Sequence, residues 1–181
     1  MTSSTGSSAG LGSVHSVVEI AASPDAVFTA LTDQRALAAW LGGDIAPPGN
    51  RNGAEAMPSF AIPGQPWHAP AIAPDGSLGS VSGEFVLVDP PRRLESTWRA
   101  SWDDFAPDRV CFELTPIRVA GMAGTRVRVT HTRAGAHLRV TAMATLGAAR
   151  VGEWPAILAR LAAWLSTPVG AAPLTTFGDW T

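Results

Sequence analysis

Residues 152–165 read GEWPAILARLAAWL, and this stretch decides the fold. Its apolar side chains recur at helical spacing and form one continuous stripe of Trp154, Ile157, Leu158, Leu161, Trp164 and Leu165. Pro155 suits the first turn of such a helix, and a helix that begins near residue 141 and kinks at this proline fits as well. The stripe is the strongest periodic signal in the chain, and it needs an apolar surface to cover.

The segments that precede this helix predict that surface. Strands are expected over residues 14–20, 80–88, 93–102, 109–115 and 125–132, and short turns such as 121–124 favour an antiparallel meander. Two short helices are expected after the first strand, beginning at Ser23-Pro24 and at Thr32-Asp33. The sequence therefore predicts an α+β fold, in which a curved antiparallel sheet wraps around the long C-terminal helix.

The domain boundaries follow from composition. We expect flexible tails over residues 1–13 and 167–181, around a single domain of residues 14–166; the second tail carries Phe177 and Trp180. Residues 44–79 are rich in proline and glycine, which predicts long loops with two short strands, around Ile45 and around residues 57–62.

Charge and hydropathy exclude several classes of protein. The 181 residues are 46% hydrophobic and 15% charged, which excludes disorder of the whole chain, and the net charge of −2 argues against a nucleic-acid partner. A lone cysteine, Cys111, excludes an internal disulfide and favours an inert structural thiol. No apolar run is long enough to insert into a membrane, and no secretory signal is evident, so a cytoplasmic location is expected.

Several stretches resemble the SRPBCC superfamily, whose fold is START-like and similar to that of the birch pollen allergen. They are VVEIAASPDAVFTALTDQRALAAWLGG (17–43), GEFVLVDPPRRLESTWRASW (83–102), DRVCFELTP (108–116), GTRVRVTHT (124–132) and GEWPAILARLAAWL (152–165). They look closest to the branch similar to the activator of the heat-shock-protein-90 ATPase. The resemblance implies a helix-grip fold with an apolar cavity between sheet and helix, and departs from the family pattern at 44–79 and 137–150.

The alternation of inward and outward residues along the strands, together with the many aromatic residues, identifies candidate side chains for this cavity. Trp and Phe suit flat apolar ligands, although ordinary core filling is the commoner role of Trp154. The candidate ligand-binding residues are Trp40, Trp67, His68, Phe85, Trp98, Phe112, Val129, His131, Trp154 and Leu158. Trp67 and His68 are expected in a loop at the cavity entrance, whereas His131 ends an apolar row that points inward.

Catalytic chemistry has only weak candidates. His131, and less strongly His68, are the two residues that could move protons; the alternative for His131 is a core histidine satisfied by its neighbours. No metal-ligand spacing, phosphate loop or nucleophile elbow is present, so no metal and no cofactor are expected.

Three functions remain open at this point. The first is binding of a small apolar or aromatic ligand in the cavity, the second a polyketide cyclase or aromatase that uses the same cavity, and the third a co-chaperone-like interaction module. The sequence does not decide whether the protein is an enzyme, or whether it is a monomer or a homodimer.

Overall fold

A computed structural model describes residues 13–42, 61–73, 75–103, 106–134 and 153–166 of the chain. The two expected tails lie outside the described residues except for Ser13. So do the expected strand around Ile45, most of the one at 57–62, and the alternative helix start near residue 141.

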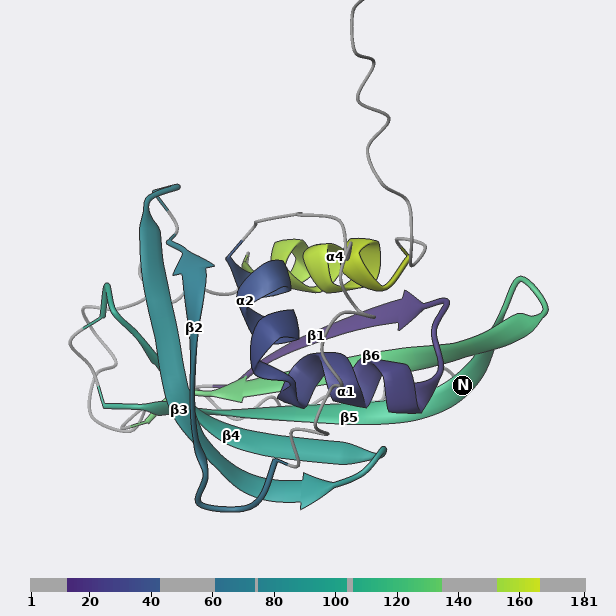
Figure 1. Cartoon of the computed structure of the whole chain (residues 1–181), viewed down its shortest axis with the longest axis horizontal. Helices are drawn as coiled ribbons and strands as arrows, with labels where there is room; N and C mark the ends of the chain where they lie inside the picture. The colour runs from purple at the N-terminus through teal and green to yellow at the C-terminus, as the bar shows by residue number, and fades with distance from the viewer. Residues whose placement is uncertain (1–12, 43–60, 74, 104–105, 135–152, 167–181) are drawn as a thin grey trace, which may run out of the picture.

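The described strands form one antiparallel sheet in the order β1-β6-β5-β4-β3-β2. Their bounds are β1 Ser13–Ile20, β2 Pro66–Ile72, β3 Leu78–Asp89, β4 Arg93–Ala100, β5 Asp108–Val119 and β6 Met122–Thr132. Strands β3 to β6 pair in chain order, so the predicted meander is confirmed. The sheet curves strongly, and β2 and β3 stand steeply against the β1–β6 end (Figure 1).

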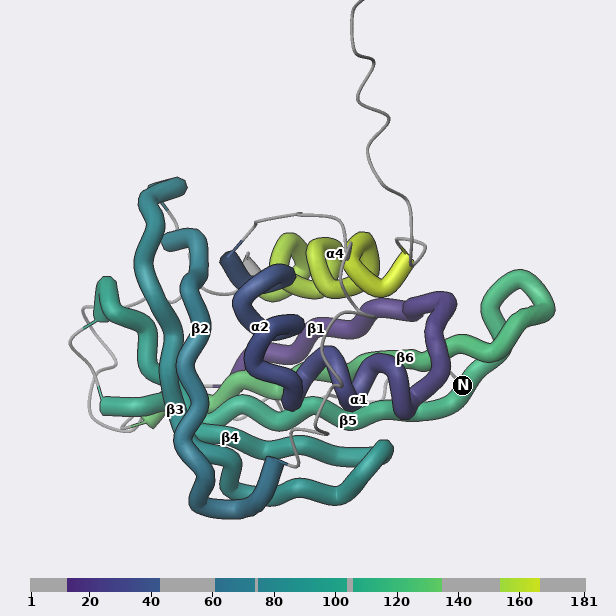
Figure 2. The backbone as a smooth tube through the Cα atoms, in the orientation of Figure 1, coloured from purple at the N-terminus to yellow at the C-terminus, as the bar shows by residue number. Residues whose placement is uncertain are grey.

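The helices α1 (Pro24–Thr32), α2 (Gln34–Leu41) and α4 (Glu153–Ser166) lie on the inner side of this curve (Figures 1 and 2). The Ser23 hydroxyl caps α1 by accepting from the Ala26 amide, and the Asp33 carboxylate caps α2 by accepting from the Arg35 and Ala36 amides. Helix α4 packs against β1 and α2, while α2 also packs against β2. The predicted helix-grip arrangement is confirmed.

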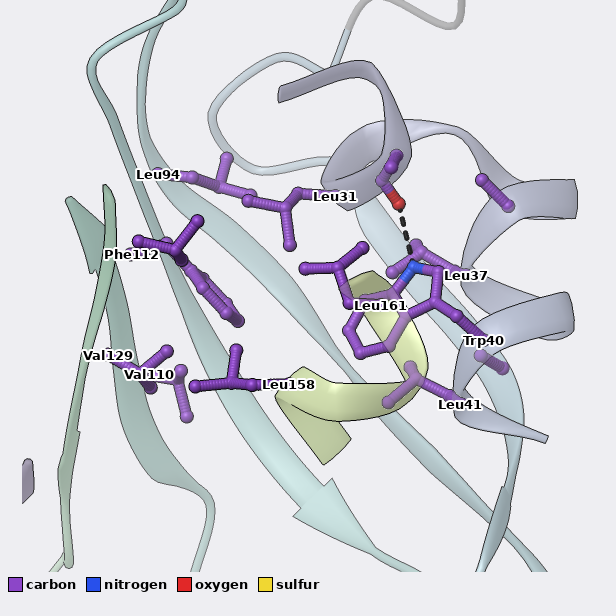
Figure 3. Close-up of a cluster of buried hydrophobic side chains, with 14 of the residues drawn as sticks. Leu31, Leu37, Trp40, Leu41, Leu94, Val110, Phe112, Val129, Leu158 and Leu161 are labelled. Carbon is purple, nitrogen blue, oxygen red and sulfur yellow. Dashed lines mark hydrogen bonds between the residues drawn. The ribbon is translucent and has the colours of Figure 1, made fainter. Parts of the chain in front are cut away.

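The core lies between α4, the first two helices and the sheet. Leu158 and Leu161 of α4 are almost completely buried, and they lie in the same cluster as Phe112 of β5 and Val129 of β6 (Figure 3). Every residue of the predicted apolar stripe is buried or partly buried against this cluster, so the stripe is what packs α4 against the sheet.

The structure corrects the prediction for residues 66–72. A loop was expected there because of its prolines, but the segment is β2, an edge strand paired with β3. Every second residue is buried, from Trp67 through Ala69 and Ala71 to Ala73. Proline is tolerated in such a strand because an edge strand does not need every amide for pairing.

The last hairpin also differs from the prediction. Its turn is at Ala120 and Gly121, both of which have positive φ, rather than at residues 121–124. Two successive residues with positive φ match the twist of the flanking strands, so β5 and β6 extend further than the hydrophobic pattern indicated.

Candidate functional site

A continuous row of aromatic rings crosses the interior from β2 to β5. Trp67 lies 6.4 Å from Phe85 and 5.2 Å from Trp98, measured between ring centroids. Trp98 lies 5.5 Å from Trp154, which in turn lies 5.8 Å from Phe112. Spacings of this size are those of attractive aromatic pairs, so the row is a connected wall rather than a set of isolated rings.

Four of these five rings line a small cavity. Five aromatic side chains line it, and the remaining lining groups are three leucines and one serine: Trp40, Trp67, Phe85, Trp98, Phe112, Leu31, Leu37, Leu94 and Ser96. Its volume is about 10 Å³, enough for about one water molecule. No described lining residue carries a charge, so the cavity is an apolar chamber with very few polar groups.

Trp67 has room at this cavity because the residue opposite it on β3 is a glycine, which has no side chain. Trp67 pairs with Gly83, and a Cβ atom added at Gly83 would lie 2.9 Å from the indole Nε1 and 1.9 Å from the Thr97 carbonyl oxygen. The indole therefore occupies space that any other residue at position 83 would take. The indole N–H of Trp67 is buried and has no hydrogen-bond partner among the described residues.

His131 lies in a buried hydrogen-bonded network next to the aromatic row. Its Nε2 is 2.9 Å from Oδ2 of Asp108, and its Nδ1 accepts from the indole Nε1 of Trp154 over 3.0 Å. The other oxygen of Asp108 accepts from the Ala134 amide at 3.0 Å. Asp108, His131 and Trp154 are respectively 2%, 8% and 2% exposed, so solvent does not compete for these bonds.

This network fixes the protonation state of the imidazole. An indole nitrogen can only donate, so Nδ1 of His131 must be the unprotonated nitrogen. The ring proton is then on Nε2 and is donated to Asp108, which makes the ring neutral. Both nitrogens are used inside the protein, and His131 is not among the residues that line the cavity. The geometry thus supports the alternative given by the sequence, a core histidine satisfied by its neighbours.

The structure brings together some of the predicted site residues and separates others. Trp40, Trp67, Phe85, Trp98 and Phe112 line the cavity. Val129, Trp154 and Leu158 are buried close by without lining it. His68 is exposed on the opposite face of β2 from Trp67, and its carbonyl oxygen accepts from the Gln34 side chain. Its predicted place in an entrance loop is wrong.

Two helix residues hold Trp40 against the cavity. Its indole N–H donates to the Ala30 carbonyl of α1 over 2.9 Å, as the dashed line in Figure 3 shows. Its backbone carbonyl accepts from the Arg160 guanidinium of α4 at 3.1 Å, and burial lowers the pKa of Arg160. These bonds tie α1, α2 and α4 together at one wall of the cavity.

The sequence analysis missed Asp108 and did not nominate Ser96, Leu31, Leu37 or Leu94 for the cavity. A signal for Asp108 was available, because it lies two residues before Val110 and therefore shares the inward face of β5. An acid on an inward face needs a partner, and His131 ends the inward row of the neighbouring strand.

The outer face of the sheet carries the cysteine. Burial raises the pKa of the Cys111 thiol, with the charges of Glu95 and Glu113 adding to the effect and Arg93 opposing it. A raised pKa means less thiolate at a given pH, and the thiolate is the nucleophile.

We therefore expect Cys111 to react slowly. Alkylation by iodoacetamide at pH 8 should be at least about tenfold slower in the native protein than in the denatured chain, because little thiolate is present and the thiol is half-buried. Rates measured across pH should rise at a higher pH in the native protein. Equal rates in both states would contradict the structural role of this thiol.

Within the described residues no helix is both long and apolar enough to cross a membrane. The same part of the chain contains no group of three or more His, Cys, Asp or Glu side chains arranged to hold a metal ion.

Comparison with known proteins agrees with this architecture. A family model described as Activator of Hsp90 ATPase homolog 1-like protein matches residues 21–166. The chain belongs to this family. The resemblance found in the sequence is thereby confirmed for the Hsp90 ATPase activator-like branch. No curated protein matches the chain.

Solved structures resemble this member of the Hsp90 ATPase activator-like family over most of its length. Protein Ms6760 from Mycobacterium smegmatis has a TM-score of 0.60 and 21% identity, covering 86% of this chain and 91% of that one. The AHSA1 protein from Silicibacter pomeroyi has a TM-score of 0.55 and 27% identity, covering 84% and 96%.

DynU16, a protein in the dynemicin biosynthetic locus, has a TM-score of 0.59 and 24% identity. The match covers 86% of this chain and 48% of DynU16, so this chain spans about half of that protein's length. At this identity the likeness establishes the shared fold, while the ligand has to be argued from the cavity.

Proposed function

We propose that the protein binds a small planar aromatic or apolar molecule in the aromatic-walled cavity. The observation that carries this proposal is the wall itself: five aromatic side chains from α2 and β2–β5 converge on one chamber whose described lining includes no charged group. Binding sites for small molecules are typically apolar with a few placed polar groups, and this chamber has that composition.

The size of the cavity sets a condition on binding. The chamber holds about 10 Å³, whereas the pocket of a drug-sized ligand is roughly 300 to 1,000 Å³. A ligand must therefore displace side chains as it enters. Movement of Trp67 and Trp98 is a measurable consequence of such an entry.

Catalysis is not part of this proposal. Among the described lining residues none is an acid or a base, and His131 holds both of its nitrogens in bonds to Asp108 and Trp154. The cyclase-like and co-chaperone-like alternatives stay predictions, because a shared fold does not carry an activity with it.

The proposal predicts saturable binding of aromatic probes. Acetophenone and 2-acetylnaphthalene span one and two rings, and we expect at least one to bind the full-length protein with a dissociation constant below about 1 mM, which corresponds to about −4.1 kcal/mol. The seven tryptophan indole N–H signals in an NMR titration report the site. Their assignment follows from single Trp-to-Phe variants.

A cavity-filling variant gives the control. Ser96→Val places methyl groups into the chamber and should weaken binding at least about tenfold, whereas Ser82→Val, on the neighbouring strand and facing outward, should leave it unchanged. Circular dichroism checks that both variants are folded. The proposal is overturned if neither probe shifts the Trp67 or Trp98 signal, or if Ser96→Val binds as tightly as the wild type.

A further inference from the structure

We propose that the indole N–H of Trp67 selects the ligand, and that the ligand is an uncharged aromatic molecule with a hydrogen-bond acceptor oxygen, such as an aryl ketone or quinone. This inference rests on the proposed function and specifies the chemical class that the cavity takes. It comes from one unsatisfied donor in a chamber whose described lining is otherwise apolar except for Ser96.

The Trp67 indole is the exception among the buried side-chain polar groups of the described residues. Its Nε1 is the one such atom without a hydrogen-bond partner, although the side chain is 94% buried. Buried polar atoms nearly always have a partner, and one without a partner in the protein needs an explanation outside it. Trp67 lines the cavity, and the proposal requires that a molecule held there reaches this indole.

The other fully buried tryptophans show how this fold satisfies an indole. The N–H of Trp40 donates to the Ala30 carbonyl, and that of Trp154 donates to the imidazole of His131. Both bonds are made by side chains and backbone of the protein itself. Trp67 is also buried but lacks such a bond, so its N–H is available to donate to a ligand in the cavity.

The surroundings of the cavity define the acceptor. An indole nitrogen only donates, so the guest must supply an acceptor. An anionic acceptor would be buried without a counter-charge, since no described lining residue is charged. A neutral oxygen on an aromatic frame satisfies the donor and matches the rings of Trp98 and Phe85. Without a ligand, the described space fits a single water molecule, which can hold this position.

Two probes of the same shape test this selection. Acetophenone and α-methylstyrene differ only in that a carbonyl oxygen replaces a methylene group. We expect the ketone to bind the wild-type protein about tenfold more tightly than the alkene, a difference of about 1.4 kcal/mol. We also expect it, and not the alkene, to move the Trp67 indole proton signal downfield in the NMR titration.

Trp67→Phe keeps an aromatic ring and removes the donor. The ratio of the two dissociation constants should fall about tenfold in this variant, whereas Trp98→Phe, from the same wall, should change both affinities and keep the ratio. If Trp67→Phe does not fold, the downfield shift in the wild type decides the question. Binding of both probes with an unchanged ratio, or with no shift, overturns this inference and leaves the proposed function standing. Binding of neither probe overturns this inference, and it overturns the proposed function as well if 2-acetylnaphthalene also fails to bind.

Discussion

His131→Ala is expected to lower the free energy of unfolding by about 4 kcal/mol. The substitution removes the donor to Asp108 and the acceptor for the Trp154 indole, both of which are buried. Leaving a buried polar group without its partner costs about 1–3 kcal/mol, and more for a charged group, and here the Asp108 carboxylate and the Trp154 indole N–H each lose a hydrogen bond that water cannot replace. Chemical denaturation followed by circular dichroism measures this loss.

The matched control is the other histidine of the same strand pair. His15 on β1 is exposed, and its Nδ1 lies 3.1 Å from the Thr130 hydroxyl, so His15→Ala should change stability by less than about 0.5 kcal/mol. His131→Gln retains a donor and an acceptor and should recover part of the loss. Equal effects of the two alanine variants would contradict the network.

The same network shows how far sequence reasoning reaches. Alternation along β6 correctly placed His131 at the end of the inward row after Val127 and Val129. It could not supply the partners, because Asp108 and Trp154 are each 23 residues away along the chain. The registers of β5 on β6 and of α4 on the sheet bring them together, and both depend on the whole fold.

The cavity residues also include some that the sequence predicts and one whose position it does not predict. Trp40, Phe85, Trp98 and Phe112 were nominated because helical and strand periodicity show which face is buried. Trp67 was nominated for a different reason, as an aromatic residue in an expected loop, and its position in β2 was not foreseen. Prolines 66 and 70 hid the alternation of Trp67 with Ala69 and Ala71, because proline normally argues against a strand. The unpartnered indole N–H depends on three-dimensional packing that no local pattern encodes.

Gly83→Ala has the second large expected effect, a loss of about 3 kcal/mol, at the upper end of the cost of overpacking. The added Cβ atom would lie 1.9 Å from the Thr97 carbonyl oxygen, closer than any real contact, and 2.9 Å from the Trp67 indole nitrogen. Because the first of these atoms is backbone, β3 and β4 must move apart. Glycine weakens a strand, so the same substitution elsewhere in a strand interior would be neutral or stabilising.

Two comparisons separate the causes of this loss. Ser82→Ala, next to Gly83 and facing outward, should stay within about 0.5 kcal/mol of the wild type. In a Trp67→Ala background the clash with Thr97 remains while the clash with the indole is removed, so the cost of Gly83→Ala should fall only in part. Full recovery would assign the whole effect to the indole. A Gly83→Ala variant as stable as the wild type would show that the close approach of β3, β4 and Trp67, on which the cavity wall depends, is not a constraint.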